Sequence, residues 1–134
     1  MRHLLMIFAV FFLTTSGSFA GDAEVARPDL LLKQVVEGMP NGDQQEIKVL
    51  TATIAPGGKT PFNTHRFPVS VYILEGSFTL EMEGLPTRTL KAGEAMVEPP
   101  NVKMTGYNKS GSEPMKVVIF YVSDPDSPFL DPVH

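Results

Sequence analysis

The 134-residue chain contains no cysteine, and this absence excludes several classes of protein. It forms no disulfide bond, so its stability must come from one hydrophobic core. It also cannot carry a lipid anchor of the cysteine-acylated kind. No basic cluster is present, and the 15 acidic residues outnumber the 11 lysines and arginines, so neither nucleic acid nor an anionic membrane is expected as a partner. No Ser–His–Asp or Cys–His arrangement and no phosphate-binding glycine loop can be identified.

The chain also lacks an apolar run long enough for a transmembrane helix, which needs about 20 residues. The longest run, residues 4–13, follows Arg2 and His3 and precedes the sequence Ser18-Phe19-Ala20. A basic start, a short apolar run and a small-x-small site are typical of a secretory signal peptide. We therefore expect cleavage after residue 20 and a secreted or periplasmic protein without a membrane partner. A hydrophobic N-terminal strand is the alternative.

The remainder is expected to form one small domain. Residues 21–29 are polar and without periodicity, typical of a loose leader. Residues 30–123 are expected to form the folded domain. Residues 124–134, rich in proline and aspartate, are expected to form an extended tail that covers a sheet edge.

Short apolar runs separated by Gly, Pro and Asn predict an all-β fold, a sandwich or a small barrel. The run 77–83 alternates cleanly, with Phe78, Leu80 and Met82 on one face, as expected for a strand with one buried face. Strands are predicted at residues 30–36, 46–54, 69–74, 77–83, 95–98, 102–107 and 115–122.

Two segments, residues 57–76 and 93–108, have the spacing of a pair of metal-binding motifs. The positions that fit are Gly57, Asn63, His65, Val69 and Gly76, then Gly93, Pro99, Asn101, Met104 and Asn108. These segments resemble the two motifs of the cupin superfamily, G-x5-H-x-H-x3-E-x6-G and G-x5-P-x-G-x2-H-x3-N. The resemblance implies a single-domain cupin jelly-roll β-barrel.

The metal-ligand positions of the resemblance are mostly substituted. Where the family has His, His, Glu and His, this chain has Asn63, His65, Val69 and Met104. A lone imidazole retains about 3–4 kcal/mol of a zinc site, which corresponds to roughly millimolar affinity. We therefore expect no metal and no other cofactor. The alternative is copper(I), held by His65 and the soft thioether of Met104, with Asn63 as a third candidate ligand.

The resemblance places His65 inside the barrel, and residues two apart in a strand share a face. The residues expected to line a ligand pocket are Asn63, His65, Phe67, Val69, Val71, Ile73 and Met104. His65 is the candidate catalytic residue, as an acid or base. It is alternatively a structural histidine or a metal ligand. The glutamates, Glu98 among them, show no pairing and are expected in solvent.

These observations leave three functions open. The first is a non-metal cupin that binds a small, partly apolar molecule in the barrel. The second is an enzyme, either a metal-dependent, dioxygenase-like oxidoreductase or a metal-free acid–base catalyst. The third is a structural or interaction domain with a filled barrel. The resemblance also makes a homodimer possible.

Overall fold

The computed structural model describes residues 23–134 and is all-β, as predicted. The predicted signal peptide, its cleavage site and the first two leader residues lie outside the described residues. Within residues 23–134, no helix is long and apolar enough to cross a membrane.

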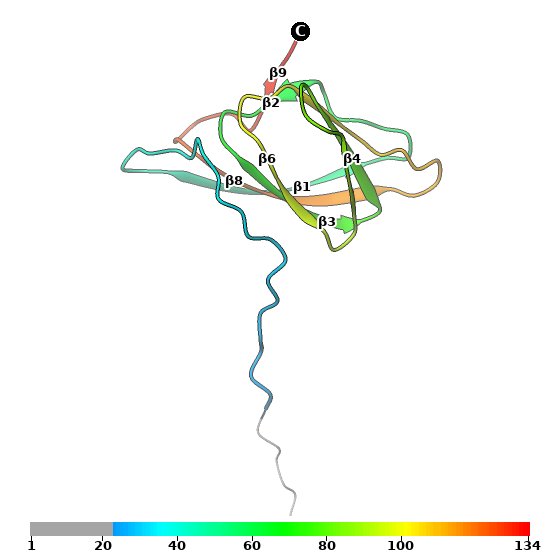
Figure 1. Ribbon diagram of the computed structural model, residues 1–134, viewed down its shortest axis with the longest axis horizontal. Helices are drawn as coiled ribbons and strands as arrows, with labels where there is room; N and C mark the ends of the chain where they lie inside the picture. Colours follow the sequence, from blue (N-terminus) through cyan, green and yellow to red (C-terminus); the bar gives the residue numbers. More distant parts are fainter. Residues whose placement is uncertain (1–22) are drawn as a thin grey trace, which may run out of the picture.

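Two antiparallel sheets face each other in a jelly-roll arrangement (Figure 1). The first sheet has the order β1 (Glu46–Ile54), β8 (Met115–Ser123), β3 (Val69–Glu75) and β6 (Ala95–Glu98). The second has the order β5 (Arg88–Lys91), β4 (Ser77–Met82), β7 (Met104–Tyr107), β2 (Asn63–Thr64) and β9 (Asp131–Pro132). Apart from the consecutive strands β4 and β5, neighbours in each sheet are not consecutive in sequence, so long-range pairing positions most of the inner side chains.

The hydrophobic core lies between the sheets and follows the two-residue period of the strands. Strand β8 shows the pattern most clearly, because Met115, Val117, Ile119 and Tyr121 are buried while the alternate residues are partly or fully exposed. Strand β3 contributes Val69, Val71 and Ile73 in the same way, and β4 contributes Phe78 and Leu80. One face of β8 and one face of β3 are therefore committed to the interior, whereas β4 also buries Thr79 between Phe78 and Leu80.

The strand predictions hold for the longer elements and for the four-residue strand at residues 95–98, and three short strands were missed. The strand at residues 46–54 is confirmed at both ends, and the last strand within one residue. The strand predicted from residue 102 begins at Met104. Strands β2, β5 and β9 were not predicted, because β2 and β9 have only two residues and β5 has a single buried one, which is too little periodicity to identify a strand.

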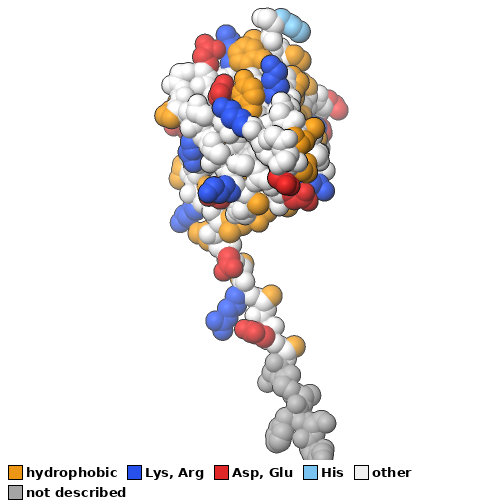
Figure 2. All heavy atoms as spheres, turned by 90° about the vertical axis from the view of Figure 1, so that its right-hand side faces the viewer, with side chains coloured by type: hydrophobic (Ala, Val, Ile, Leu, Met, Phe, Trp, Pro, Cys, Tyr) orange, Lys and Arg blue, Asp and Glu red, His pale blue; other side chains and the backbone are white. Residues whose placement is uncertain are grey.

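The strand predicted at residues 30–36 is wrong. This segment is an extended arm outside both sheets, and Val35 is 96% exposed. Its apolar residues favour a strand, but a strand also needs a hydrogen-bonding neighbour, and no backbone hydrogen bond connects the arm to the rest of residues 23–134. Figure 2 shows the N-terminal end of the described chain projecting from the barrel, on whose visible face basic and acidic side chains are intermixed.

The turn between β3 and β4 requires a glycine. Gly76 has a φ of 71°, and a Cβ atom added there would lie 2.5 Å from the carbonyl oxygen of Pro114. Only glycine avoids both the left-handed backbone penalty and this contact with backbone. The last residue of the second motif is equally structural. The side chain of Asn108 is 1% exposed and donates to the carbonyls of Ile54 and Glu113 at 2.9 and 2.8 Å.

Candidate functional site

The barrel interior contains a cavity of about 210 Å³, and a sphere of that volume is about 7 Å across. Most of its wall is apolar, and residues from both sheets and the C-terminal tail contribute to it. Its polar side chains are those of Asn63, His65, Glu98 and Thr60. The apolar part includes Ile54, Val71, Phe78, Leu80, Met104, Val117, Ile119, Phe129 and Leu130.

The structure brings four of the seven predicted pocket residues together around this cavity, namely Asn63, His65, Val71 and Met104. Asn63 and Met104 are direct partners across β2 and β7. The other three predicted residues, Phe67, Val69 and Ile73, are not part of the wall. Val69 and Ile73 are fully buried on the inner face of β3, and Phe67 packs against the core.

Glu98 is the site residue that the sequence analysis missed. It was expected in solvent but is only 5% exposed, lines the cavity and lies next to His65. The reason is the period of β6, because Glu98 follows Met96 by two residues and shares its inward face. Glu98 is also the strand partner of Val69, so a carboxylate enters the site from the strand beside the position where the cupin motif has one.

Two backbone contacts hold His65, which is 4% exposed. Its Nδ1 lies 2.7 Å from the carbonyl oxygen of Phe129 in the tail, and its own carbonyl accepts from the amide of Asn101 at 2.7 Å. Asn101 has a φ of 59°, a conformation that asparagine adopts more readily than most residues. The imidazole also packs against the ring of Phe129 at 4.7 Å between centroids, so its orientation is fixed.

The two ring nitrogens of His65 have different hydrogen-bond partners. A carbonyl oxygen only accepts hydrogen bonds, so Nδ1 of His65 carries a hydrogen. Nε2 lies 3.3 Å from Oε2 of Glu98. This contact is a hydrogen bond when one proton lies between the two atoms, and the pair then has no net charge. The separation exceeds the roughly 2.7–2.9 Å of a tight charged hydrogen bond, so the pair is loosely engaged.

Asn63 presents an acceptor without a partner. Its Nδ2 donates to the carbonyl of Pro61 at 2.7 Å, which orients the amide, while its buried Oδ1 has no hydrogen-bond partner among the described residues. Buried polar atoms are usually paired, and leaving one unpaired costs about 1–3 kcal/mol. An unpaired acceptor on a cavity wall is a place for a ligand's hydrogen-bond donor.

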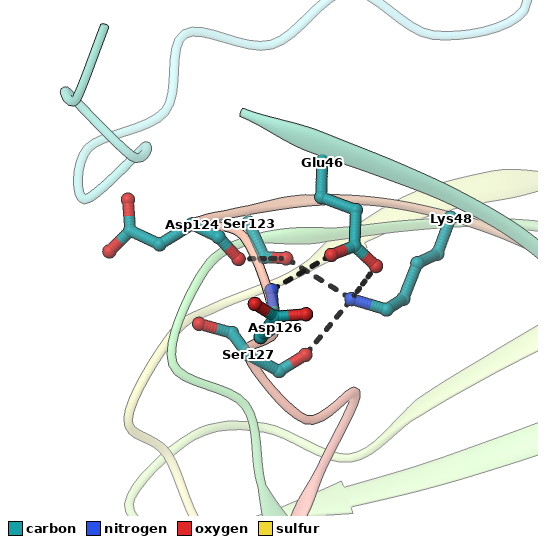
Figure 3. Close-up of polar contacts among 6 residues, drawn as sticks. All are labelled: Glu46, Lys48, Ser123, Asp124, Asp126 and Ser127. Atoms are coloured by element: carbon teal, nitrogen blue, oxygen red, sulfur yellow. Dashed lines mark hydrogen bonds and ion pairs between the residues drawn. The ribbon is translucent and has the colours of Figure 1, made fainter. Parts of the chain in front are cut away.

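The C-terminal tail contributes Phe129 and Leu130 to the cavity wall, and polar contacts hold the start of the tail to strand β1 (Figure 3). There, Lys48 Nζ contacts Glu46 at 2.6 Å and the carbonyl of Ser127 at 2.9 Å, and Glu46 accepts from the amide of Asp126 at 2.9 Å. The Lys48 ammonium, followed by that amide, lowers the pKa of Glu46.

The end of the tail is held to the second sheet. Strand β9 pairs with β2, so the tail does cover a sheet edge. Arg66 donates to both carboxylate oxygens of Asp131, at 2.8 and 3.0 Å, and this bidentate contact lowers the pKa of Asp131. Phe129, whose carbonyl orients His65, therefore lies in a segment that is held to β1 before it and to β2 after it.

The donor atoms at the site do not match a divalent metal. Catalytic zinc sites use three protein ligands, whereas residues 23–134 contain no group of three His, Cys, Asp or Glu side chains that would surround an ion. His65 and Glu98 are the two strong donors here. Met104 lines the same cavity as His65 and adds only a soft thioether.

Comparison with known proteins identifies the family. The sequence model of the Cupin domain matches residues 50–121, a span that contains both motif segments. The chain belongs to the cupin family. The match ends before Phe129 and Leu130, so part of the cavity wall of this cupin lies beyond the matched domain.

Solved structures agree with this fold. A cupin-like protein from Thermotoga maritima is 24% identical with a TM-score of 0.54, covering 65% of this chain and 64% of that one. A polyketide cyclase from Streptomyces resistomycificus is 22% identical with a TM-score of 0.54, covering 66% and 61%. A double-stranded β-helix protein from Klebsiella pneumoniae is 16% identical with a TM-score of 0.55, covering 75% and 90%.

These likenesses concern the fold. This cupin spans less than two thirds of the length of the first two proteins. No curated protein matches the sequence. The activity of this cupin must therefore be argued from its own cavity.

Proposed function

We propose that this cupin binds one small, mostly apolar molecule in the barrel cavity and does so without a metal. The observation that carries the proposal is the cavity of about 210 Å³, apolar over most of its wall and polar at His65, Glu98 and Asn63. Apolar sites with a few placed polar groups are the usual form of small-molecule pockets. An apolar cavity of about 150 Å³ is large enough for benzene, so a molecule of about eight to ten non-hydrogen atoms fits here.

The side chains that could donate to a metal ion support binding of the ligand without a metal. Asn63, Val69 and Met104 replace three of the four ligands of the family motif. Glu98 adds one carboxylate, which with His65 gives two strong donors. Two donors at about 3–4 kcal/mol each support only weak, roughly micromolar binding. The proton shared between them must also be displaced first.

The test is a calorimetric titration of chelator-treated protein, from which any affinity tag has been removed, with toluene, benzyl alcohol, benzylamine and benzoate. Binding of at least one probe at a single site supports the proposal, and failure of all four contradicts it. Val117→Phe is designed to fill the cavity and should abolish binding, because Val117 faces it from the central strand. Val118→Phe is the matched control, since the next residue on β8 faces outward and should leave binding intact.

Copper(I) is the second candidate, favoured by the shared cavity of His65 and Met104. Titration with Cu(I), Zn²⁺, Fe²⁺ and Ni²⁺ under reducing conditions distinguishes a copper site from a divalent-metal site and from a cavity without a metal. Tight copper binding that Met104→Leu removes would replace the small-molecule proposal. Tight binding of a divalent ion would restore the metal-dependent oxidoreductase.

We propose further that the protein acts outside the cytoplasm after cleavage behind Ala20, which the intact mass of the exported protein tests.

A further inference from the structure

We propose that the ligand is a small primary amine, bound as an ammonium ion by His65, Glu98 and Asn63. This inference rests on the proposed binding function and specifies the chemistry of the same site. Its basis is the kind of polar atom that the cavity presents. Nδ1 of His65 donates to Phe129 and is not left for a ligand, and Nδ2 of Asn63 is held by the hydrogen bond that one of its two hydrogens donates to Pro61.

Most of the polar atoms left for a ligand are acceptors. Asn63 offers Oδ1, which has no partner among the described residues. Glu98 offers its carboxylate, engaged by a 3.3 Å contact with His65. His65 offers Nε2 once the proton that it shares with Glu98 has left. The three residues that carry these acceptors line one cavity about 7 Å across. A primary ammonium group has three N–H donors and no acceptor, which matches this set.

The charge balance also favours an amine. The empty pair holds one proton and is neutral. An incoming ammonium ion replaces that proton, which passes to solvent, so Glu98 is ionised, His65 is neutral and the occupied site again has no net charge. A carboxylate ligand would instead place an anion beside acceptors in an apolar cavity, which is costly unless it is paired. A neutral alcohol leaves the shared proton in place and satisfies only one acceptor.

The proton provides a direct readout. Benzylamine binding should release one proton per molecule, measured by calorimetry in phosphate and Tris buffers, whose ionisation enthalpies differ. By linkage, the affinity should rise about tenfold per pH unit while the empty pair is protonated and the free amine is charged. Benzylamine should bind roughly ten- to a hundredfold more tightly than benzyl alcohol, because hydrogen bonds to charged groups are the stronger ones.

Glu98→Gln should remove the proton release and the preference for the amine, while benzyl alcohol binding persists. Glu81→Gln is the matched control, since this exposed carboxylate on β4 is paired with Lys109 outside the cavity. If Glu98→Gln does not fold, the proton count of the natural protein still decides. Equal affinity for alcohol and amine without proton release, or a preference for benzoate, would overturn the amine inference and leave the binding function standing. If no probe binds, the binding function itself is refuted.

Discussion

The contact between His65 and Glu98 predicts a large coupling between the two side chains. Both side chains are less than a tenth exposed, and their atoms approach to 3.3 Å. His65→Leu leaves the Glu98 carboxylate in an apolar cavity without its ionic partner, which should cost about 3–5 kcal/mol of unfolding free energy. Glu98→Leu leaves an imidazole that can stay neutral and bonded to Phe129, so it should cost only about 1–2 kcal/mol.

The double variant should be more stable than His65→Leu alone. It removes the buried charge and leaves only the Phe129 carbonyl unpaired, a loss of about 1 kcal/mol, while apolar replacement of a buried pair is often neutral or stabilising. We therefore expect the second substitution to restore about 3 kcal/mol. Urea unfolding followed by far-ultraviolet circular dichroism measures all four proteins, since the chain has no tryptophan.

Additivity of the two single substitutions within about 0.5 kcal/mol would refute this reasoning, because it would mean that the side chains do not interact. If His65→Leu alone fails to fold, recovery of a folded protein by the second substitution demonstrates the same coupling. If the double variant is the least stable of the four, the pair is a net stabilising element and the account of the cavity is wrong.

Three further predictions concern the framework around the site. Asn108→Ala should cost about 2–4 kcal/mol in urea unfolding, because two hydrogen bonds are lost and two backbone carbonyls lose their donor; a loss below 1 kcal/mol would contradict the anchoring role. Gly76→Ala should lower the melting temperature more than Gly84→Ala, since both glycines have a φ above 70° but only Gly76 faces nearby backbone; equal shifts would contradict this. The pKa of Asp131 lies below its usual 3.8 because of Arg66, so the stabilisation from this ion pair is complete above that value and lost as the pH falls through the depressed pKa; the protection of tail amides against exchange, relative to their intrinsic rates, should fall there, and unchanged protection would show that the pair does not hold the tail.

The fold was predictable because it is encoded in local spacing. The alternation in β4 and the two motif segments indicate strands and a cupin barrel without knowledge of any contact. The arm at residues 30–36 shows the limit of such reasoning. Its composition is that of a strand, yet whether a strand forms depends on a neighbouring edge, and the sequence does not specify which edges remain open.

The candidate site was predictable only in part. Motif spacing places His65 and Asn63 inside the barrel, as the structure has them. Glu98 was missed because charged residues are usually exposed. The signal that would have found it is its position two residues after Met96 on a short strand with a buried face. The hydrogen bond from His65 to Phe129 was not predictable, since a backbone carbonyl leaves no mark in the sequence.

The central claim is that the cavity of this cupin holds a small organic molecule and no metal. Native mass spectrometry of the mature protein, purified untagged from its source organism before and after treatment with a chelator, tests this most directly. We predict that the chelator leaves the mass unchanged, and that any added mass is that of a small organic molecule lost on denaturation. A mass increase equal to one metal ion, removed by the chelator and restored by that ion, would contradict the claim.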